Sequence, residues 1–288
     1  MKQVGKIKEI WRFPVKSMQG DVIDSCEVST QGVTGDRVWA MRDEARSEIQ
    51  WGKKYPQLML CKARYRSEPG AGDFAPVDIT FPDGEILGSD DDRVHAKLSQ
   101  LIEGRATLQH LQPPDNVAFY KRYKESEEQF VHDITEAFAR EPGEPMPDLA
   151  DFPEVIVDHV SVPGTFFDNE ELHMITTASI THMQSLNPNA NWDIRRFRPN
   201  FFIETTKDLS GLAENEWVGK RISIGEVEME ISAPTPRCGM TVRPQDDIEY
   251  DKTILRSIVK EANQCLGVGA HCKKSGRIQR GDAVCILD

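Results

Sequence analysis

The sequence predicts a mainly β (α+β) protein, in which β-barrels or sandwiches carry peripheral helices. Many short segments alternate apolar and polar residues, which is the period of a half-buried strand. Few segments show the period of a helix, and strands and helices do not alternate along the chain, so a parallel α/β sheet is not expected. No glycine-rich phosphate loop follows a strand, which argues against nucleotide-binding folds of the Rossmann and Walker types.

The first 111 residues have the pattern of successive strands with one helix. Strands are expected at 7–13, 22–28, 37–42, 56–66, 77–87 and 106–111. Residues 77–87 are expected to form a hairpin, because Pro-Asp-Gly separates their two halves. A helix should follow Ser89 or Asp90, either of which can cap it, since the apolar residues between 94 and 102 fall on one face.

Residues 112–150 are rich in proline and acidic side chains and have little periodicity. They predict a connecting segment, partly ordered by 130–138, between one domain at 1–111 and another at 151–288. In the second domain, strands are expected at 154–161, 172–176, 195–204, 220–232 (a hairpin), 267–273 and 282–287, with helices from about 177 and over 252–265. Pro199 should bend its strand or place it at an edge, because proline cannot donate to a ladder.

The composition limits the classes of partner. The formal net charge is −12, which argues against broad binding to nucleic acid or to an anionic membrane surface. No apolar run approaches the roughly 20 residues that cross a bilayer, and residues 1–17 lack the apolar core of a secretory signal. We therefore expect a soluble, cytoplasmic protein. Its six cysteines are scattered, unlike those of a small disulfide scaffold, and should be reduced.

Cys238, in the loop segment 233–240, is the sharpest candidate for chemistry. The guanidinium of a neighbouring arginine, here Arg237, favours the thiolate form of a cysteine. Thiolates are nucleophiles and ligands for soft metals. Gly239 leaves space beside the sulfur for a bulky ligand. The alternative is a buried and inert loop cysteine, since cysteine is among the most buried residue types.

Two segments offer cationic groups to an anion. Lys16 and Ser17 at a strand end can present an ammonium, a hydroxyl and backbone N–H groups. Arg196 and Arg198 are expected on one face of a strand and are followed by Asn200, an arrangement that suits a bidentate grip on phosphate or carboxylate. The alternatives are a solvated lysine in a turn and surface ion pairs in an acidic protein.

Two further segments are weaker candidates. Arg37 begins a predicted strand and could face a pocket or pair with a nearby carboxylate. Thr177 and Ser179, in the segment 176–180, supply hydroxyl and free N–H groups at a helix start, which is a common element of anion sites. Ordinary N-capping explains the same residues without a ligand.

Several segments occur in an order that resembles a known family. They are WRFPVKSMQG (11–20), GDRVWAM (35–41), LHMITTASI (172–180), RRFRPNFFIE (195–204), WVGKRISIGEVEMEI (217–231), the Arg-Cys loop and RGDAVCIL (280–287). Together they resemble the MOSC family, named after the C-terminal domain of molybdenum cofactor sulfurases. The chain is similar to two-part members such as amidoxime-reducing components and their bacterial relatives, in which a MOSC N-terminal β-barrel domain precedes the MOSC domain.

The resemblance implies a cofactor and its ligands. Cys238 would be the molybdenum ligand and catalytic residue of a bound molybdenum cofactor (molybdopterin). The implied cofactor-binding residues are Lys16, Ser17, Arg37, Thr177, Ser179, Arg198, Asn200 and Arg237. Pyridoxal phosphate binding is also associated with the family. Two departures put the chemistry in doubt, because Pro236 replaces a serine of the amidoxime-reducing branch and residues 49–54 replace its threonine-rich segment.

The function that follows from the resemblance is reduction of N-hydroxylated or N-oxide-type small molecules. The chain has no ferredoxin-type cysteine spacing, so electrons would come from a separate ferredoxin, flavodoxin or cytochrome. A second hypothesis is a sulfur carrier or cofactor-delivery protein that uses a Cys238 persulfide or thiolate. A third is a zinc site made of Cys265, His271, Cys272 and Cys285, whose spacing matches no known zinc finger.

Overall fold

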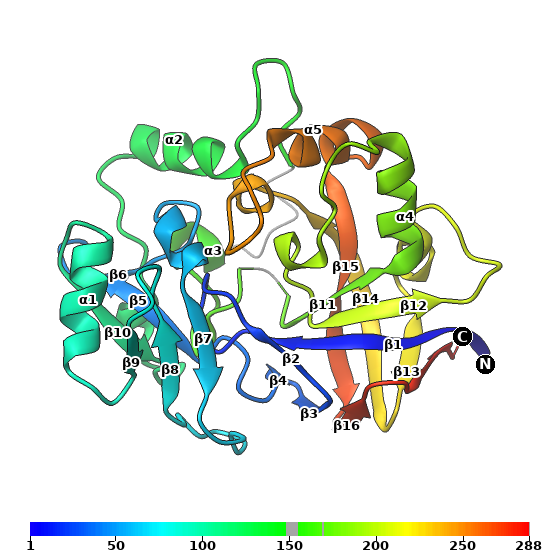
Figure 1. The fold of residues 1–288 in the computed structure, drawn as a ribbon, viewed down its shortest axis with the longest axis horizontal. Coiled ribbons are helices and arrows are strands. Elements are labelled where there is room, and N and C mark those ends of the chain that lie inside the picture. Colours follow the sequence, from blue (N-terminus) through cyan, green and yellow to red (C-terminus); the bar gives the residue numbers. More distant parts are fainter. Residues whose placement is uncertain (148–154, 169, 288) are drawn as a thin grey trace.

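The main feature of the computed structural model, which describes residues 1–147, 155–168 and 170–287, is a closed barrel of seven strands (Figure 1). Around the barrel the strands run in the order β12, β11, β15, β14, β13, β17 and β1, and β1 pairs with β12 to close it. Their bounds are β1 Lys2–Arg12, β11 Leu172–Thr176, β12 Phe201–Thr205, β13 Arg221–Ile224, β14 Val227–Pro236, β15 Cys265–Lys274 and β17 Ala283–Ile286. The predicted mainly β fold with a barrel is confirmed.

The first strand of the chain joins a barrel whose other strands all come after residue 171. β1 pairs antiparallel with β12 and with β17, which places the two chain ends side by side (Figure 1). A side chain at Gly5 would lie 2.4 Å from the carbonyl oxygen of Glu204, so the close pairing with β12 requires glycine there. β2 (Asp21–Ile23) adds to the other end of β1. The chain then leaves the barrel at Phe13, which positions the next residues at its rim.

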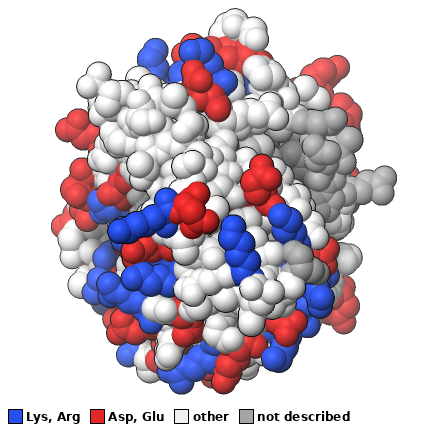
Figure 2. Space-filling view, turned by 90° about the vertical axis from the view of Figure 1, so that its right-hand side faces the viewer, with Lys and Arg blue, Asp and Glu red and all other residues white. Residues whose placement is uncertain are grey.

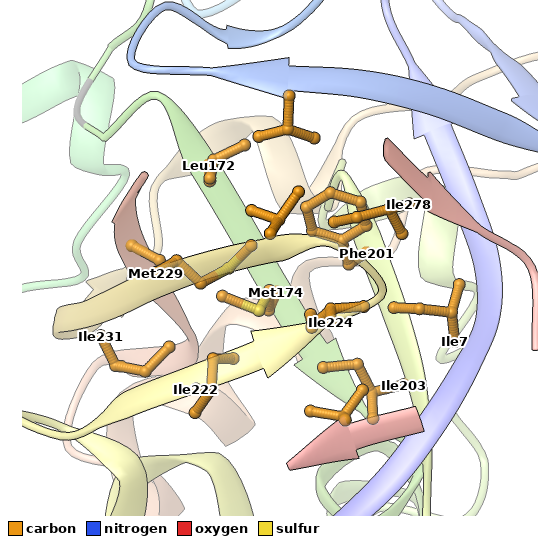
Figure 3. Close-up of a cluster of buried hydrophobic side chains, with 14 of the residues drawn as sticks. Ile7, Leu172, Met174, Phe201, Ile203, Ile222, Ile224, Met229, Ile231 and Ile278 are labelled. Carbon is orange, nitrogen blue, oxygen red and sulfur yellow. The ribbon is translucent and has the colours of Figure 1, made fainter. Parts of the chain in front are cut away.

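Aliphatic, methionine and phenylalanine side chains fill the interior of the barrel (Figure 3). Ile7, Met174, Phe201, Ile224 and Met229 point inward from five different strands and are at most 1% exposed. The alternation of apolar and polar residues along β14 therefore has the predicted meaning, with its apolar face in the core and its glutamates outside. On the side of the barrel shown in Figure 2, lysine, arginine and acidic side chains are interspersed.

Small sheets form the rest of the molecule. β10 (Ala106–His110), β5 (Trp39–Asp43) and β6 (Glu48–Ile49) form one; β7 (Lys62–Tyr65), β8 (Val77–Thr80) and β9 (Ile86–Gly88) a second; β16 (Gly276–Gln279), β3 (Ser25–Ser29) and β4 (Gly32–Val33) a third. The first two sheets enclose their own core, to which α1 (Arg93–Leu101) contributes Val94 and Leu98. The third sheet links the two ends of the sequence, because β16 pairs with β3.

The remaining helices lie at the periphery (Figure 1). They are α2 (Glu127–Phe138), α3 (Val155–Asp158), α4 (Thr177–Leu186) and α5 (Lys252–Glu261), with 3-10 helices η1 (Pro56–Leu60), η2 (Val117–Tyr120), η4 (Ile194–Arg196), η5 (Ala213–Trp217) and η6 (Gly239–Val242). The oxygens of Ser126, Thr176 and Asp251 cap α2, α4 and α5. Among the described residues, no helix has the length and hydropathy to span a bilayer.

Two predicted strands are helical at their starts. The segment 56–66 opens with η1, because a proline at the first helical position presets the backbone for a turn, and only its second part forms β7. The segment 154–161 contains α3, although its alternating apolar residues favoured a strand. Residue 154 itself lies outside the described residues.

The predicted strand 195–204 is also shorter than expected. Only Phe201–Thr205 is extended, after η4 and an irregular turn through Arg198 and Pro199. The expectation that Arg196 and Arg198 share a strand face is therefore wrong. Arg198 has a φ of +53°, which no strand residue adopts.

We predict that Ile7→Ala lowers the free energy of unfolding by about 2–5 kcal/mol, because it leaves a cavity in the barrel where its closing strand lies. Chemical denaturation measures this change. The matched control is Lys6→Ala on the exposed side of β1, which should change stability by less than about 0.5 kcal/mol. Equal effects of the two substitutions would show that β1 does not close the core.

Candidate functional site

A cavity of about 160 Å³ lies where the rim of the barrel meets the loop that follows β1 and the loop before β5. Both halves of the sequence supply its walls. The N-terminal half gives Lys16, Ser17, Arg37, Lys53 and Phe138, and the C-terminal half gives Asp168, Glu170, Leu172, His173, Arg196, Phe197, Arg198, Thr235, Pro236, Arg237, Cys238, Met240, Thr241 and Gly269. Six of these residues are the predicted Lys16, Ser17, Arg37, Arg198, Arg237 and Cys238.

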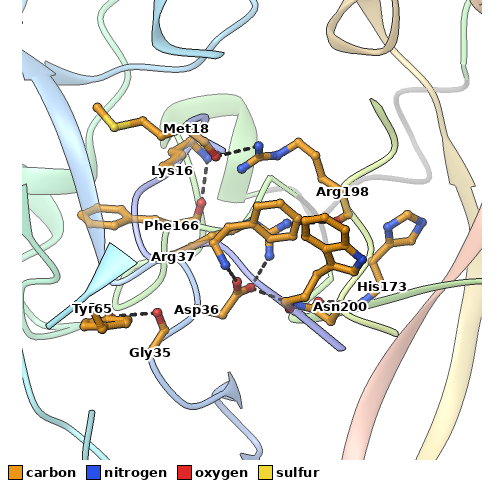
Figure 4. A network of polar contacts seen from close by, with 12 residues as sticks. Lys16, Met18, Gly35, Asp36, Arg37, Tyr65, Phe166, His173, Arg198 and Asn200 are labelled. Carbon is orange, nitrogen blue, oxygen red and sulfur yellow. Dashed lines mark hydrogen bonds and ion pairs between the residues drawn. The ribbon is translucent and has the colours of Figure 1, made fainter. Parts of the chain in front are cut away.

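Lys16 is the buried ammonium group of the N-terminal wall. It donates to the carbonyl of Phe166 (2.7 Å; Figure 4). It also forms an ion pair with Asp168. Lys53 approaches the other oxygen of the same carboxylate, at 3.6 Å. Ser17 accepts a hydrogen bond from the backbone N–H of Gly52 (2.7 Å), which fixes the segment carrying Lys53 against the wall.

Asp36 ties the two halves together behind the cavity (Figure 4). Its carboxylate accepts from the backbone N–H of Phe13 (2.7 Å), from the side chain of Asn200 (3.0 Å) and from Arg37. Asn200 in turn accepts from the backbone N–H of His173 (3.1 Å). One buried carboxylate thus sets the relative position of the N-terminal loop and of the turn before β12.

Arg198 and Arg237 are the buried guanidinium groups of the C-terminal wall. Arg198 reaches across to the N-terminal half, where it donates to the carbonyl of Met18 (2.7 Å). Arg237 donates to the carbonyl of Phe197 (2.7 Å) and lies 3.4 Å from His173 Nε2. Burial and the neighbouring Arg237 lower the pKa of His173 well below its ordinary value. His173 is therefore neutral at pH 7 and accepts the contact from Arg237.

Cys238 lies between the end of β14 and η6, is partly exposed, and lines the cavity. Its backbone carbonyl accepts from the hydroxyl of Thr241 (2.9 Å), which fixes the turn. A side chain at Gly239 would lie 3.0 Å from Ala139 Cβ, so this glycine lets the end of the α2 segment cover the turn. Four of the other cysteines take no part in this cavity, namely Cys26, Cys61, Cys272 and Cys285.

Positive charge dominates the cavity. Burial lowers the pKa of Arg237 to about 10, and burial together with Arg37 lowers the pKa of Arg198 to about 9. Burial also lowers the pKa of Lys16, against the opposing effect of Asp168. These shifts mean that the protein holds several cations away from water with few counter-charges. An anion entering the cavity would relieve that cost.

Two nitrogen atoms of the cavity arginines lack a partner among the described residues. Arg198 Nη2 and Arg237 Nε are buried and form no hydrogen bond. Burying a charged N–H group unpaired costs about 1–3 kcal/mol or more, so such atoms are rare unless a ligand or water satisfies them. Both belong to residues that line the cavity, where an acceptor-rich ligand would satisfy them.

The backbone is strained at the same place. Ser17, Arg37 and Arg198 adopt left-handed conformations, with φ of +68°, +50° and +53°. A non-glycine residue in this region costs of order 1–3 kcal/mol and persists only where its surroundings enforce it. Here the enforcing contacts are those of Gly52, Asp36 and Met18. The strain aims three polar side chains at one cavity.

Comparisons with known proteins agree with this picture. Residues 4–110 match the MOSC N-terminal beta barrel domain, and residues 163–285 match the MOSC domain. The chain belongs to the MOSC domain family.

Individual relatives are distant. The MOSC chain is 23% identical to mitochondrial amidoxime reducing component 2 from Bos taurus over 303 aligned positions, which cover 99% of this chain and 84% of that protein. Among solved structures, the YUAD protein from Bacillus subtilis has a TM-score of 0.43 at 10% identity. The alignment covers 99% of this chain and 96% of the YUAD chain. YiiM from Geobacillus stearothermophilus has a TM-score of 0.31 at 11% identity, over 41% of this chain and 55% of its own.

Three predicted residues of the MOSC chain lie away from the cavity wall. Asn200 is one layer behind it, bonded to Asp36. Thr177 contacts Thr205 at the start of α4, where its hydroxyl accepts from a backbone N–H (3.1 Å). Ser179 donates to Glu214 (2.5 Å). The expectation that Thr177 and Ser179 line the same pocket as Arg198 is therefore corrected, because these hydroxyls serve local structure.

Sequence reasoning missed Asp168, Lys53 and His173. Asp168 follows Phe166-Phe167 in a segment without periodicity, and nothing in it signals a partner for Lys16. Lys53 belongs to the segment 49–54, which stands where amidoxime-reducing relatives have a threonine-rich motif. That position in the family pattern could have indicated that Lys53 lies at the site. His173 sits in a predicted strand, where its alternation with Leu172 and Met174 gave its direction but not its neighbours.

The proposed zinc set does not come together in the part of the chain that the structure describes. The one group there with metal-ligand geometry is Glu170, Glu171 and His271, and it includes no cysteine. His271 contacts both carboxylates, at 3.1 and 2.9 Å, as an ordinary ion-pair cluster does.

We predict that Glu214→Gln stabilises the MOSC chain at neutral and higher pH. Burial raises the pKa of Glu214 above its ordinary value, although Ser179 and Thr176 donate to it, and its second oxygen has no described partner. A raised pKa in the folded state contributes stability that is complete at low pH and is lost as pH rises through the folded value.

Thermal unfolding of both proteins from pH 4 to pH 8 measures this. The advantage of the glutamine variant should grow with pH, whereas Glu216→Gln, exposed in the same η5, should show no such trend. A pH-independent difference between wild type and Glu214→Gln would contradict the account.

Proposed function

We propose that this MOSC chain binds a molybdenum cofactor in the cavity between its two halves and reduces N-hydroxylated or N-oxide-type small molecules. The observation that carries the proposal is the position of the partly exposed residue Cys238 in the wall of a cavity that is also lined by buried cations with few counter-charges. The matched domains and the distant relation to an amidoxime reducing component support an association with this cofactor.

The residues present fit the chemistry of that group. A pterin with a phosphate and a dithiolene needs anion grips, hydrogen-bond partners and, at the metal, a soft ligand. Lys16, Arg198 and Arg237 offer charged donors. Two of their nitrogen atoms, Arg198 Nη2 and Arg237 Nε, have no partner among the described residues and could donate to a ligand. Cys238 offers the soft donor. Arg37 and Ser17 complete the polar wall.

We infer that the carboxylate of Asp168 occupies the position that an anionic group of the cofactor would take beside Lys16. The lysines lower the pKa of Asp168, against the effect of burial, so the carboxylate stays ionised. It contacts both Lys16 and Lys53, as a phosphate group would. The cavity is smaller than the roughly 300–1,000 Å³ of usual ligand pockets. Binding would therefore require Asp168 to release Lys16 and swing away from the cavity.

When bound, the cofactor would supply reversible redox chemistry at its metal. The chain's own residues would bind and orient the anionic end, and Cys238 would hold and tune the metal through sulfur. Neutral His173 keeps Arg237 in place by accepting its N–H. Electrons would come from a separate ferredoxin, flavodoxin or cytochrome, which remains part of the proposal.

Metal and pterin analysis of protein purified from a host that makes the cofactor tests this function. We expect wild type to carry molybdenum and pterin together. Cys238→Ser should lose most of the metal and keep part of the pterin, because the anion grip is intact. Lys16→Gln combined with Arg198→Gln should lose both, at least about tenfold, since each charged hydrogen bond contributes about 1.5–3 kcal/mol.

The matched control is Cys285→Ser, a partly buried cysteine on β17 away from the cavity, which should behave as wild type. Absence of both molybdenum and pterin from wild type would contradict the proposal. Detection of an added sulfur on Cys238 by mass spectrometry, without bound metal, would favour the sulfur-carrier hypothesis instead.

A further inference from the structure

A second hollow of about 640 Å³ adjoins the cavity on the far side of Lys53. It lies between the segment 46–56, the segment after η2, and α2. Its lining residues are Arg46, Glu48, Gln50, Trp51, Lys53, Lys54, Pro56, Arg122, Tyr123, Phe130, His132, Asp133, Ile134, Thr135, Glu136, Ala137, Ala139, Arg140 and Arg243. We refer to it as the α2 groove. Its volume is within the range of small-molecule sites.

The α2 groove is positively charged although the protein is acidic. Six of its lining residues are lysine or arginine and three are acidic, against a net charge of −12 for the whole chain. The acidic groups are occupied by neighbours. Glu48 accepts from Gln50 (2.7 Å) and from the backbone N–H of Tyr123 (3.1 Å), and Asp133 accepts from Gln129 (2.7 Å). Glu48 and Asp133 remain negative charges near Lys54, but within the described ranges neither forms an ion pair with it.

Four of those cations form no ion pair with any carboxylate in the described ranges. They are Arg46, Lys54, Arg140 and Arg243. Lys54 Nζ and Arg243 Nε are buried and have no hydrogen-bond partner there. Burial and the nearby Arg46 lower the pKa of Lys54, against the opposing effects of Glu48, Asp133 and Asp43. Arg140 is held by backbone carbonyls, at 2.8 Å from Phe138 and 3.1 Å from Arg237.

Aromatic rings lie beside three cations of the groove, Lys53, Arg122 and Arg46. Lys53 Nζ lies 4.3 Å from the centre of the Trp51 ring, and the guanidinium of Arg122 lies 5.1 Å from it. Arg46 lies 4.9 Å from the ring of Tyr123. Cation–π contacts of this kind hold long side chains extended. Planar rings beside fixed cations are the groups that bind a flat molecule carrying a negative charge.

Lys53 connects the groove with the cavity that contains Cys238. It lines both, and it lies 3.6 Å from Asp168 and 5.9 Å from the ring of Phe138. Phe138 faces the cavity, while its neighbours Ala137 and Ala139 line the groove. The last turn of α2 and Lys53 are therefore the partition between the two spaces. A molecule in the groove has one end beside the cavity.

We propose that the α2 groove is the substrate site of this MOSC chain and that it selects planar aromatic or heteroaromatic molecules with a carboxylate or phosphate group. The assignment of the groove as a substrate site rests on the proposed reductase function. The preference of the groove for planar anions does not depend on that function. The anionic group lies against Lys54 and Arg46, which are close to each other, and the reducible end points past Lys53 toward Cys238.

Calorimetric titration with benzoate and with benzamide, which have the same shape and differ in charge, tests the preference without turnover. We expect wild-type protein, as purified, to bind benzoate at least about tenfold more tightly than benzamide, since a charged acceptor strengthens each hydrogen bond. Arg46→Gln combined with Lys54→Gln should abolish the difference. The control pair Lys62→Gln and Arg64→Gln removes the same charge near Asp21, outside the groove, and should retain it.

Arg198→Gln distinguishes the two anion sites, because it changes the cavity and leaves the groove intact. It should bind benzoate as wild type does. Equal affinity for the two probes, or equal losses in the groove and control variants, would overturn the proposal. So would loss of benzoate binding in Arg198→Gln with no loss in the groove variant.

Turnover separates this proposal from the reductase function. A benzamidoxime with a para carboxylate should have a KM at least about fivefold below that of its carboxamide counterpart, and the groove variant should remove this ratio. If neither compound is reduced while the benzoate preference persists, the reductase function fails and the groove stands as an anion-binding site. If both are reduced with equal KM, the substrate assignment is overturned and the reductase function stands.

Discussion

Buried positive charge around one small cavity is the constraint on which the rest of the site depends. Lys16, Arg198 and Arg237 are at most 8% exposed, and burial lowers the pKa of each. Proteins keep such groups charged only where an anion or a dense set of acceptors compensates them. Asp168 supplies part of that compensation, and Arg198 Nη2 and Arg237 Nε remain without a hydrogen-bond partner among the described residues.

The fold brings these charges together because β1, at the start of the chain, pairs with strands from its second half. β1 closes a barrel made otherwise of strands after residue 171, so the loop that follows β1 is delivered to the barrel rim. Asp36 then fixes that loop by bonding to Phe13 and Asn200. Neither half of the chain contains the cavity by itself. The matched domain boundaries describe the sequence, whereas the site belongs to the junction between the matched regions.

Sequence reasoning could find several of the residues that line the cavity but not their arrangement. The strand period located the barrel strands, and the types of Lys16, Arg37, Arg198, Arg237 and Cys238 pointed to an anion with a soft metal. The left-handed turns at Ser17, Arg37 and Arg198 could not be foreseen, because no glycine marks them and their cause is tertiary contact. The prediction that Thr177 and Ser179 line the cavity was wrong for a related reason. The hydroxyl of Ser179 donates to the buried Glu214, a contact between residues 35 positions apart that the local sequence does not reveal. The division into domains at 111 and 150 remains a prediction.

The most direct measurement of the central claim is calorimetric titration of cofactor-free protein with inorganic phosphate, for wild type and for Arg198→Gln. Arg46→Gln combined with Lys54→Gln serves as the background in both, so that the α2 groove does not contribute. The account predicts saturable binding that weakens steeply with salt and is lost, by at least about tenfold, when Arg198 is replaced. Binding that is absent, or that is unchanged by the substitution, would contradict it.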